Sequence, residues 1–115
     1  DLSPDGTRLV MAKPFWAGDS ILRVLDLRTK KERVVHVRGW SSFQWIAWDP
    51  RGEGWFVSSW WAGGKALLRI EPDGRATLLH NTETWLGRQS VSPDGRRLAF
   101  AEQTYDGNVW IADRR

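Results

Sequence analysis

The sequence predicts an all-β fold built from three repeats of about 43 residues each. Two observations predict it. One proline turn recurs three times in register, and short runs of alternating apolar and polar residues follow each copy. No segment shows apolar residues at a period of 3.6 over the length of a helix. We therefore expect strands throughout and no helix longer than a turn or two.

The proline turns define the repeat. They read Ser3-Pro4-Asp5-Gly6, Asp49-Pro50-Arg51-Gly52 and Ser92-Pro93-Asp94-Gly95, with their prolines 46 and then 43 residues apart. Proline sets φ for the second turn position, and glycine takes the positive φ that leads into the next strand. The expected structural turn residues are therefore Pro4, Gly6, Pro50, Gly52, Pro93 and Gly95.

Four apolar runs belong to each complete repeat. The first run follows the proline turn, and the second ends in an acid at residues 22–26, 67–71 and 109–113. The third run covers 33–37 and 76–80, and the fourth leads into the next proline turn at 43–48 and 88–91. Four strands in 40 to 45 residues are typical of a β-propeller blade. We expect one partial propeller domain over 1–115 with repeats at about 1–42, 43–86 and 87–115, the first lacking its innermost strand and the last its outermost.

The proline turns also carry a family resemblance. The sequence resembles the TolB-type, WD40-like propeller repeats, whose mark is Trp-Ser-Pro-Asp-Gly. Only the middle copy keeps the tryptophan, as Trp48, and that copy has Arg51 in place of the aspartate. A narrower resemblance, to the last blades of propeller sensor domains of bacterial Ser/Thr kinases or winged-helix regulators, is carried by Gly39-Trp40, Ala47-Trp48, residues 56–59 and Asn108-Val109-Trp110. It implies a sensing or protein-binding role. The sequence leaves the compartment open, and the family resemblance suggests a periplasmic or other extracytoplasmic location.

Composition excludes several function classes. The net charge is +3, and basic residues meet only in short pairs spread along the chain, which argues against a nucleic-acid surface. The absence of cysteine excludes disulfides and thiolate metal sites. No apolar run approaches the roughly 18 residues of a membrane span. The chain begins at Asp1 on a turn motif, so we expect it to be part of a longer protein.

Residues suited to catalysis are few. His36 and His80 occupy corresponding positions in two repeats, so their similarity follows from the repeat and not from a shared site. The sequence has no zinc-binding His-Glu-x-x-His motif, no Gly-x-Ser-x-Gly elbow and no phosphate loop. We therefore expect no catalytic residue, no metal and no cofactor.

Nine tryptophans in 115 residues are the strongest compositional signal. Successive loops of a blade alternate between two faces, and the aromatic residues fall in the loops of one face. These are Phe15, Trp16, Trp40, Trp60, Trp61, Trp85 and Tyr105. The rings either fill gaps between blades or form a recognition face, for which Trp16, Trp40, Trp60, Trp61, Trp85 and Tyr105 are the candidate binding residues. The strand tryptophans Trp45, Trp48, Trp55 and Trp110 are expected in the core.

The sequence favours a non-catalytic sensing or scaffolding propeller that binds a protein or a small ligand. Two alternatives stay open. One is the gating propeller of a prolyl-oligopeptidase-like serine peptidase, and the other is a periplasmic TolB-like scaffold for envelope proteins. Three blades leave two unpaired sheet edges, which we expect to pair with the remaining blades or with another copy.

Overall fold

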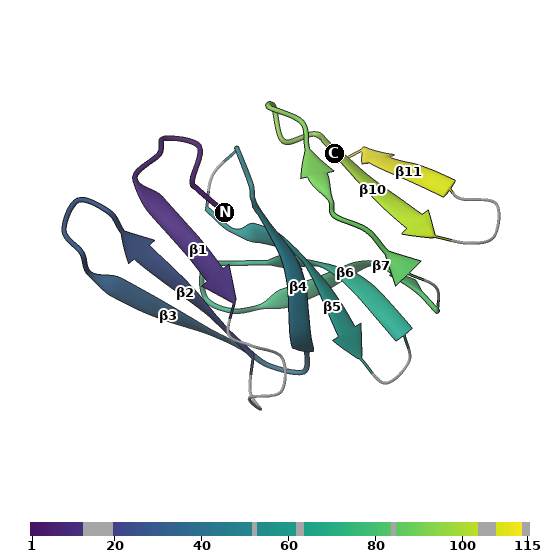
Figure 1. Cartoon of the computed structure of the whole chain (residues 1–115), viewed down its shortest axis with the longest axis horizontal. Coiled ribbons are helices and arrows are strands. Elements are labelled where there is room, and N and C mark those ends of the chain that lie inside the picture. The colour runs from purple at the N-terminus through teal and green to yellow at the C-terminus, as the bar shows by residue number, and fades with distance from the viewer. Residues whose placement is uncertain (13–19, 52, 62–63, 84, 104–107, 114–115) are drawn as a thin grey trace.

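A computed structural model describes residues 1–12, 20–51, 53–61, 64–83, 85–103 and 108–113. These ranges contain strands, turns and bends but no helix, and hence no helical segment able to cross a membrane (Figure 1). The predicted all-β fold is confirmed. The strands form three antiparallel sheets that follow one another along the chain.

Each sheet is one propeller blade. Blade 1 contains β1 (Arg8–Ala12), β2 (Ser20–Asp26) and β3 (Glu32–Val37) in that order. Blade 2 contains β4 (Ser41–Trp48), β5 (Trp55–Trp61), β6 (Gly64–Ile70) and β7 (Ala76–Thr82), again in chain order. In blade 3, β10 (Arg97–Gln103) pairs with β11 (Asn108–Asp113) on one side and with β8 (Trp85–Leu86) and β9 (Ser90–Val91) on the other.

The first and last blades are incomplete, as the sequence predicts. In the described part of blade 1, only an isolated bridge between Leu2 and Leu9 marks the position of the innermost strand. In blade 3, β11 pairs with β10, and no described strand lies on its outer side. The innermost strand of blade 3 differs from the prediction of one strand over 88–91. It is split into β8 and β9, and residues 87–89 between them make no ladder with β10.

Period-two alternation in blade 2 divides the core into two layers. Trp55 and Val57 of β5 face blade 1 and join one buried cluster, whereas Phe56 between them joins a second cluster with Leu98 and Phe100 of blade 3. The side chains of β6 divide in the same way. Both faces of blade 2 are therefore covered, as expected for a blade with a neighbour on each side.

The proline turns share one hydrogen-bonded geometry and lie along the same, upper edge of the sheets (Figure 1). In each turn the first residue donates its backbone N–H to a carbonyl five residues later, over distances of 2.7, 3.0 and 2.9 Å for Ser3, Asp49 and Ser92. The turn glycines Gly6 and Gly95 have φ of +74° and +72°, as predicted. Gly52 lies outside the described residues.

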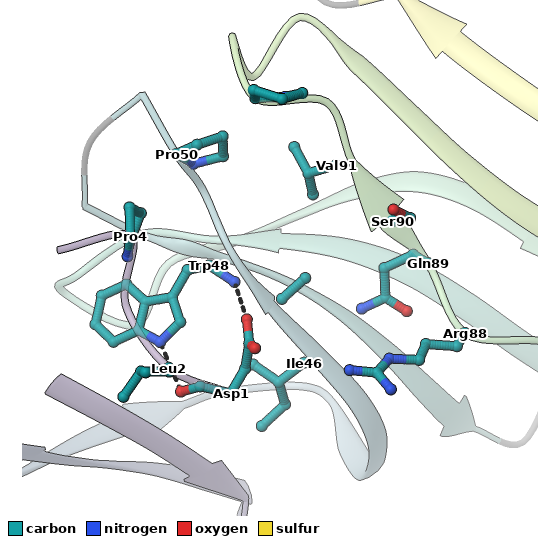
Figure 2. Close-up of a pocket in the computed structure, with 12 residues that line it drawn as sticks. Asp1, Leu2, Pro4, Ile46, Trp48, Pro50, Arg88, Gln89, Ser90 and Val91 are labelled. Carbon is teal, nitrogen blue, oxygen red and sulfur yellow. Dashed lines mark hydrogen bonds between the residues drawn. The ribbon is translucent and has the colours of Figure 1, made fainter. Parts of the chain in front are cut away.

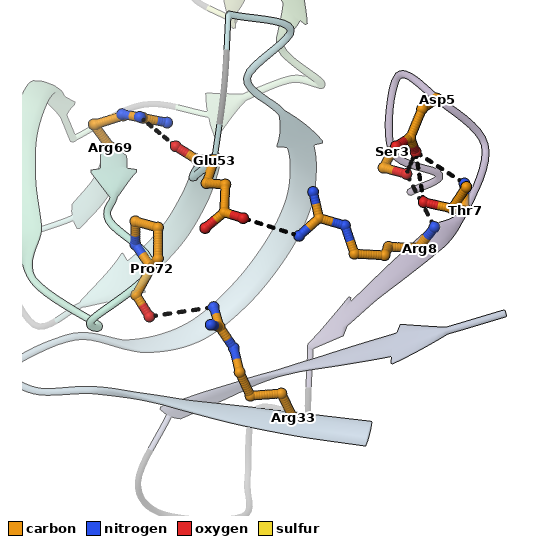
Figure 3. Close-up of polar contacts among 8 residues, drawn as sticks. All are labelled: Ser3, Asp5, Thr7, Arg8, Arg33, Glu53, Arg69 and Pro72. Atoms are coloured by element: carbon orange, nitrogen blue, oxygen red, sulfur yellow. Dashed lines mark hydrogen bonds and ion pairs between the residues drawn. The ribbon is translucent and has the colours of Figure 1, made fainter. Parts of the chain in front are cut away.

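Polar side chains tie neighbouring turns together (Figure 3). Arg8 of blade 1 forms an ion pair of 3.3 Å with Glu53 in the turn of blade 2. Arg69 at the end of β6 donates to the Glu53 carbonyl oxygen at 2.9 Å. Arg33 of β3 reaches the carbonyl oxygen of Pro72 in the β6–β7 turn at 3.4 Å. These contacts fix blade 1 against blade 2 at the turn edge.

One core prediction is wrong. Trp48 and Trp55 are buried as expected and meet edge to face with ring centroids 5.4 Å apart, but Trp45 is 42% exposed. The pairing of β4 with β5 shifts between Phe43 and Ile46, so two residues of β4 oppose the single residue Ser58 of β5. Such a bulge interrupts the alternation and turns Trp45 outward. The side chain of Trp110 lies outside the described residues.

Candidate functional site

Three of the aromatic residues predicted to form a binding rim, Trp40, Trp60 and Trp85, have their backbones at the strand ends opposite the proline turns. Trp40 directly precedes β4, and Ser41 at the start of β4 pairs with Trp60 near the end of β5. Strand pairing thus brings the backbones of Trp40 and Trp60 together. Trp85 at the start of β8 pairs with Gln103 at the end of β10, which places its backbone at the corresponding end of blade 3.

The two described rings differ in burial. Trp40 is half-buried and packs against the core shared by blades 1 and 2. Trp60 is 36% exposed, and the ammonium nitrogen of Lys65 lies 4.9 Å from its ring centroid. A cation at this distance over an indole face is a favourable electrostatic arrangement. Trp40 therefore fills the gap between blades, whereas Trp60 presents apolar surface.

The structure says less about the other aromatic residues of the predicted rim. Phe15, Trp16 and Tyr105 lie outside the described residues, as do the side chains of Trp61 and Trp85. The backbone of Trp61 ends β5 beside Trp60.

A cavity of about 540 Å³ lies at the opposite, proline-turn edge, where the innermost strands of the blades face one another (Figure 2). Its apolar lining comes from the three turn prolines and from β4 and β9, as Pro4, Pro50, Pro93, Ile46, Trp48 and Val91. Its polar lining comes from Asp1, Arg88, Gln89 and Ser90. We call it the axial cavity, because innermost strands line the axis of a propeller.

Asp1 forms one polar wall of the axial cavity. Its carboxylate accepts a hydrogen bond of 3.1 Å from the backbone N–H of Trp48, and its carbonyl oxygen accepts one of 2.9 Å from the Trp48 indole (Figure 2). Burial lowers the pKa of the Asp1 α-amino group, and the positive charge of Arg88 lowers this pKa further. The charge of Arg88 is therefore felt on the opposite side of the cavity.

Arg88 and Gln89 form the second polar wall. Both belong to the segment between β8 and β9, where the strand is interrupted. The Gln89 amide nitrogen donates to the carbonyl oxygens of Trp45 and Phe56 at 2.9 and 2.7 Å. The Arg88 guanidinium lies 5.9 Å from the ring centroid of Trp45. This pair was not singled out from the sequence. Two consecutive polar residues, Arg88 and Gln89, in a strand predicted to be innermost could have indicated it.

The two histidines are not brought together. His36 is exposed on β3 of blade 1, whereas His80 is half-buried on β7 of blade 2 with its ring 4.9 Å from that of Phe100. Within the described ranges, no group of three His, Cys, Asp or Glu residues is close enough to hold a metal ion.

The acidic turn residues have structural roles. Asp5 accepts hydrogen bonds from the hydroxyls of Thr7 and Ser3, both at 2.7 Å, and from the Thr7 backbone N–H. These bonds lower the pKa of Asp5 to about 2. Asp94 accepts the equivalent bonds in the third turn, where the Ser92 hydroxyl and then the Arg96 backbone N–H lower its pKa.

Solved structures share this fold, although no protein-family model and no curated protein matches the chain. TolB from Acinetobacter baumannii superposes with a TM-score of 0.70 at 19% identity, over 96% of this chain and 27% of the TolB chain. A prolyl endopeptidase superposes with a TM-score of 0.71 at 18% identity, over 98% of this chain and 20% of its own. The chain thus spans between a fifth and about a quarter of these proteins, and the similarity shows that it has the fold of consecutive β-propeller blades.

Proposed function

We propose that this chain is a non-catalytic binding module of a larger propeller. It recognises a protein or a small ligand through the strand ends that carry Trp40, Trp60, Trp61 and Trp85, which we call the aromatic edge. The observation that carries the proposal is the exposed Trp60 ring at the strand ends opposite the proline turns, where the backbone of Trp40 also lies. Tryptophan gives a large contact area for little loss of side-chain entropy and is enriched among residues that dominate binding.

Two further features support a binding role without catalysis. The charge of Lys65 lies over Trp60, so apolar surface and a cation occur together, as in many recognition sites. The two histidines lie on different blades, so they do not form a joint site, and the Ser-Asp pairs of the proline turns are occupied in holding those turns together. We also infer that the outer edge of β11, and the part of the β1 edge beyond the Leu2–Leu9 bridge, pair with further strands or with another copy, because unpaired strand edges offer main-chain hydrogen bonds.

The experiment follows the tryptophan indole N–H signals by NMR while three probes are titrated. The probes are a β-linked glucose oligosaccharide, a tyrosine-containing tripeptide and tetramethylammonium chloride, which represent the sugar, peptide and cation chemistries that stack on indole rings. We expect at least one probe to shift the Trp60 signal saturably. Trp60→Ala should then weaken that binding by about 2 kcal/mol or more, as for other dominant contact residues.

Trp45→Ala is the matched control, because Trp45 is similarly exposed but belongs to the innermost strand near the axial cavity. It should leave binding of the selected probe unchanged. If no probe moves the Trp60 signal in the folded chain, or if Trp45→Ala weakens binding as much as Trp60→Ala, the aromatic edge is not the recognition surface.

The superposition on a prolyl endopeptidase favours a second candidate, a propeller that controls access to a peptidase domain. Under this candidate the nucleophile and its base would lie in residues that flank this chain in its gene. A Gly-x-Ser-x-Gly elbow in the flanking sequence would select the peptidase, and a kinase catalytic loop or a winged helix would select a sensing module.

A further inference from the structure

We propose that the axial cavity is a second binding site, for a carboxylate whose neighbouring atom carries an N–H donor. This chemistry occurs in an N-acylated amino acid and at the carboxyl end of a peptide. The site is separate from the aromatic edge of the proposed function. It lies at the proline-turn edge and uses Arg88 and Gln89, neither of which belongs to that set.

The side-chain oxygen of Gln89 requires a hydrogen-bond donor from the ligand. Its side chain is only 4% exposed, and both partners of its amide nitrogen are carbonyl oxygens, of Trp45 and Phe56. Carbonyl oxygens only accept hydrogen bonds, so the amide group has one possible orientation. Its Oε1 atom then has no hydrogen-bond donor among the described residues, although Gln89 lines the cavity. A buried acceptor without a donor is costly, and a ligand N–H would satisfy it.

The guanidinium of Arg88 requires a negatively charged group on the ligand. It extends from the same segment toward Ile46 on the β4 side of the cavity (Figure 2). Its guanidinium lies over the Trp45 ring at 5.9 Å, and the described residues give it no carboxylate partner. Among the described residues, the acidic group that lines the cavity is Asp1, whose carboxylate accepts a hydrogen bond from the Trp48 backbone N–H. A guanidinium binds a planar carboxylate through two parallel N–H···O bonds.

The donor that Gln89 requires and the anion that Arg88 requires together define the class of ligand. Sulfate would place only acceptor oxygens against Gln89 Oε1, so it would satisfy Arg88 but not Gln89. An α-N-acyl carboxylate offers acceptors to Arg88 and a donor to Gln89 in adjacent positions. The turn prolines, Ile46 and Val91 provide apolar contact for a short side chain or acyl group.

The test titrates the whole chain with three matched probes and observes the Gln89 side-chain NH₂ signals by ¹⁵N NMR. N-acetylglycine has both features, N-acetylglycinamide lacks the carboxylate, and N-acetylsarcosine lacks the N–H. We expect N-acetylglycine to shift the Gln89 signals saturably and each of the other two to bind about tenfold more weakly or worse. Inorganic sulfate should leave these signals unchanged. A tripeptide with a free or an amidated carboxyl end then separates the two sources, because tighter binding of the free tripeptide than of N-acetylglycine identifies a peptide terminus.

Arg88→Gln should reduce N-acetylglycine binding at least tenfold, whereas Arg96→Gln, an equal change of charge at an exposed turn position, should not. Neither residue is buried, so both variants should fold, which unchanged melting temperatures would confirm. Unmoved Gln89 signals, or equal binding by Arg88→Gln and the parent chain, would overturn the proposal. Trp60→Ala should retain N-acetylglycine binding. The proposal for the axial cavity and the proposal for the aromatic edge can therefore be contradicted separately.

Discussion

The carboxylate of Asp49 and the guanidinium of Arg69 form an ion pair of 3.2 Å with side chains only 3% and 13% exposed. Asp49 begins the proline turn of blade 2, and Arg69 lies near the end of β6. Arg69 also forms a contact of 3.4 Å with Glu71 and lies 5.3 Å from the ring centroid of Phe56. One side chain thus connects the turn, the sheet and the aromatic core of this blade.

Arg69→Met should therefore destabilise the chain strongly, by about 3 kcal/mol, because the Asp49 carboxylate is left buried without its cation. Urea unfolding monitored by tryptophan fluorescence measures the change. The double variant Asp49→Asn with Arg69→Met should recover part of the loss, since no uncompensated charge remains. Arg23→Gln removes the exposed ion pair with Glu32 and should change stability little, because solvent screens exposed charges. A loss in Arg69→Met no larger than that in Arg23→Gln would show that the Asp49 contact is not important.

Gln89 joins blade 3 to blade 2 through two main-chain acceptors. Gln89→Leu keeps the side-chain size but leaves the carbonyl oxygens of Trp45 and Phe56 without this donor, so we expect a loss of about 2 kcal/mol. Hydrogen exchange should increase first in the strands of blade 3, because its attachment to blade 2 is weakened. Gln44→Leu, on the exposed side of the same β4 bulge, is the control. Uniform exchange across both blades would contradict this role.

The turn glycines allow a matched comparison. Gly6 and Gly95 have nearly the same φ, but a Cβ at Gly6 meets nothing within 4 Å, whereas a Cβ at Gly95 meets the side chain of Arg51. Gly6→Ala should cost about 1 kcal/mol through backbone strain alone. Gly95→Ala should cost more, because Arg51 must also move. Thermal unfolding of the two variants measures the difference, and equal losses would exclude a steric contribution from the neighbouring turn.

The depressed pKa of Asp5 should make the free energy of unfolding decrease at acidic pH. Its folded pKa of about 2 lies below the ordinary value of 3.8. The contribution to stability is therefore complete above about pH 4 and is lost as the pH falls toward 2. Thr7→Val removes the hydroxyl hydrogen bond that lowers this pKa most, so the Asp5 pKa should rise toward 3.8 in an NMR titration.

Thr29→Val is the control for this titration. Backbone N–H groups of Thr29 and Arg28 are the main causes that lower the pKa of Asp26, and the Thr29 hydroxyl contributes least. The pKa of Asp26 should therefore change little. An Asp5 pKa that stays near 2 in Thr7→Val would mean that the hydroxyl does not set it.

Local residue patterns were enough to predict the proline turns, most of the strands and two of the buried tryptophans. Proline and glycine fix the backbone of a turn locally, so the turns that begin at Ser3 and Ser92 form the same hydrogen bonds at opposite ends of the chain. Alternation is also local, and the expected burial of Trp48 and Trp55 is confirmed.

The place where the alternation fails, and the distant residues that meet, depend instead on contacts between blades. Trp45 is exposed because β4 bulges opposite Ser58, and the displaced backbone of Trp45 is satisfied by the Ser58 hydroxyl and by Gln89 from another blade. The axial cavity likewise joins Asp1, Trp48 and Arg88, residues from three blades. A bulge and a cavity depend on hydrogen-bond partners and packing surfaces supplied by segments far apart in the chain, and a local pattern carries no information about such partners.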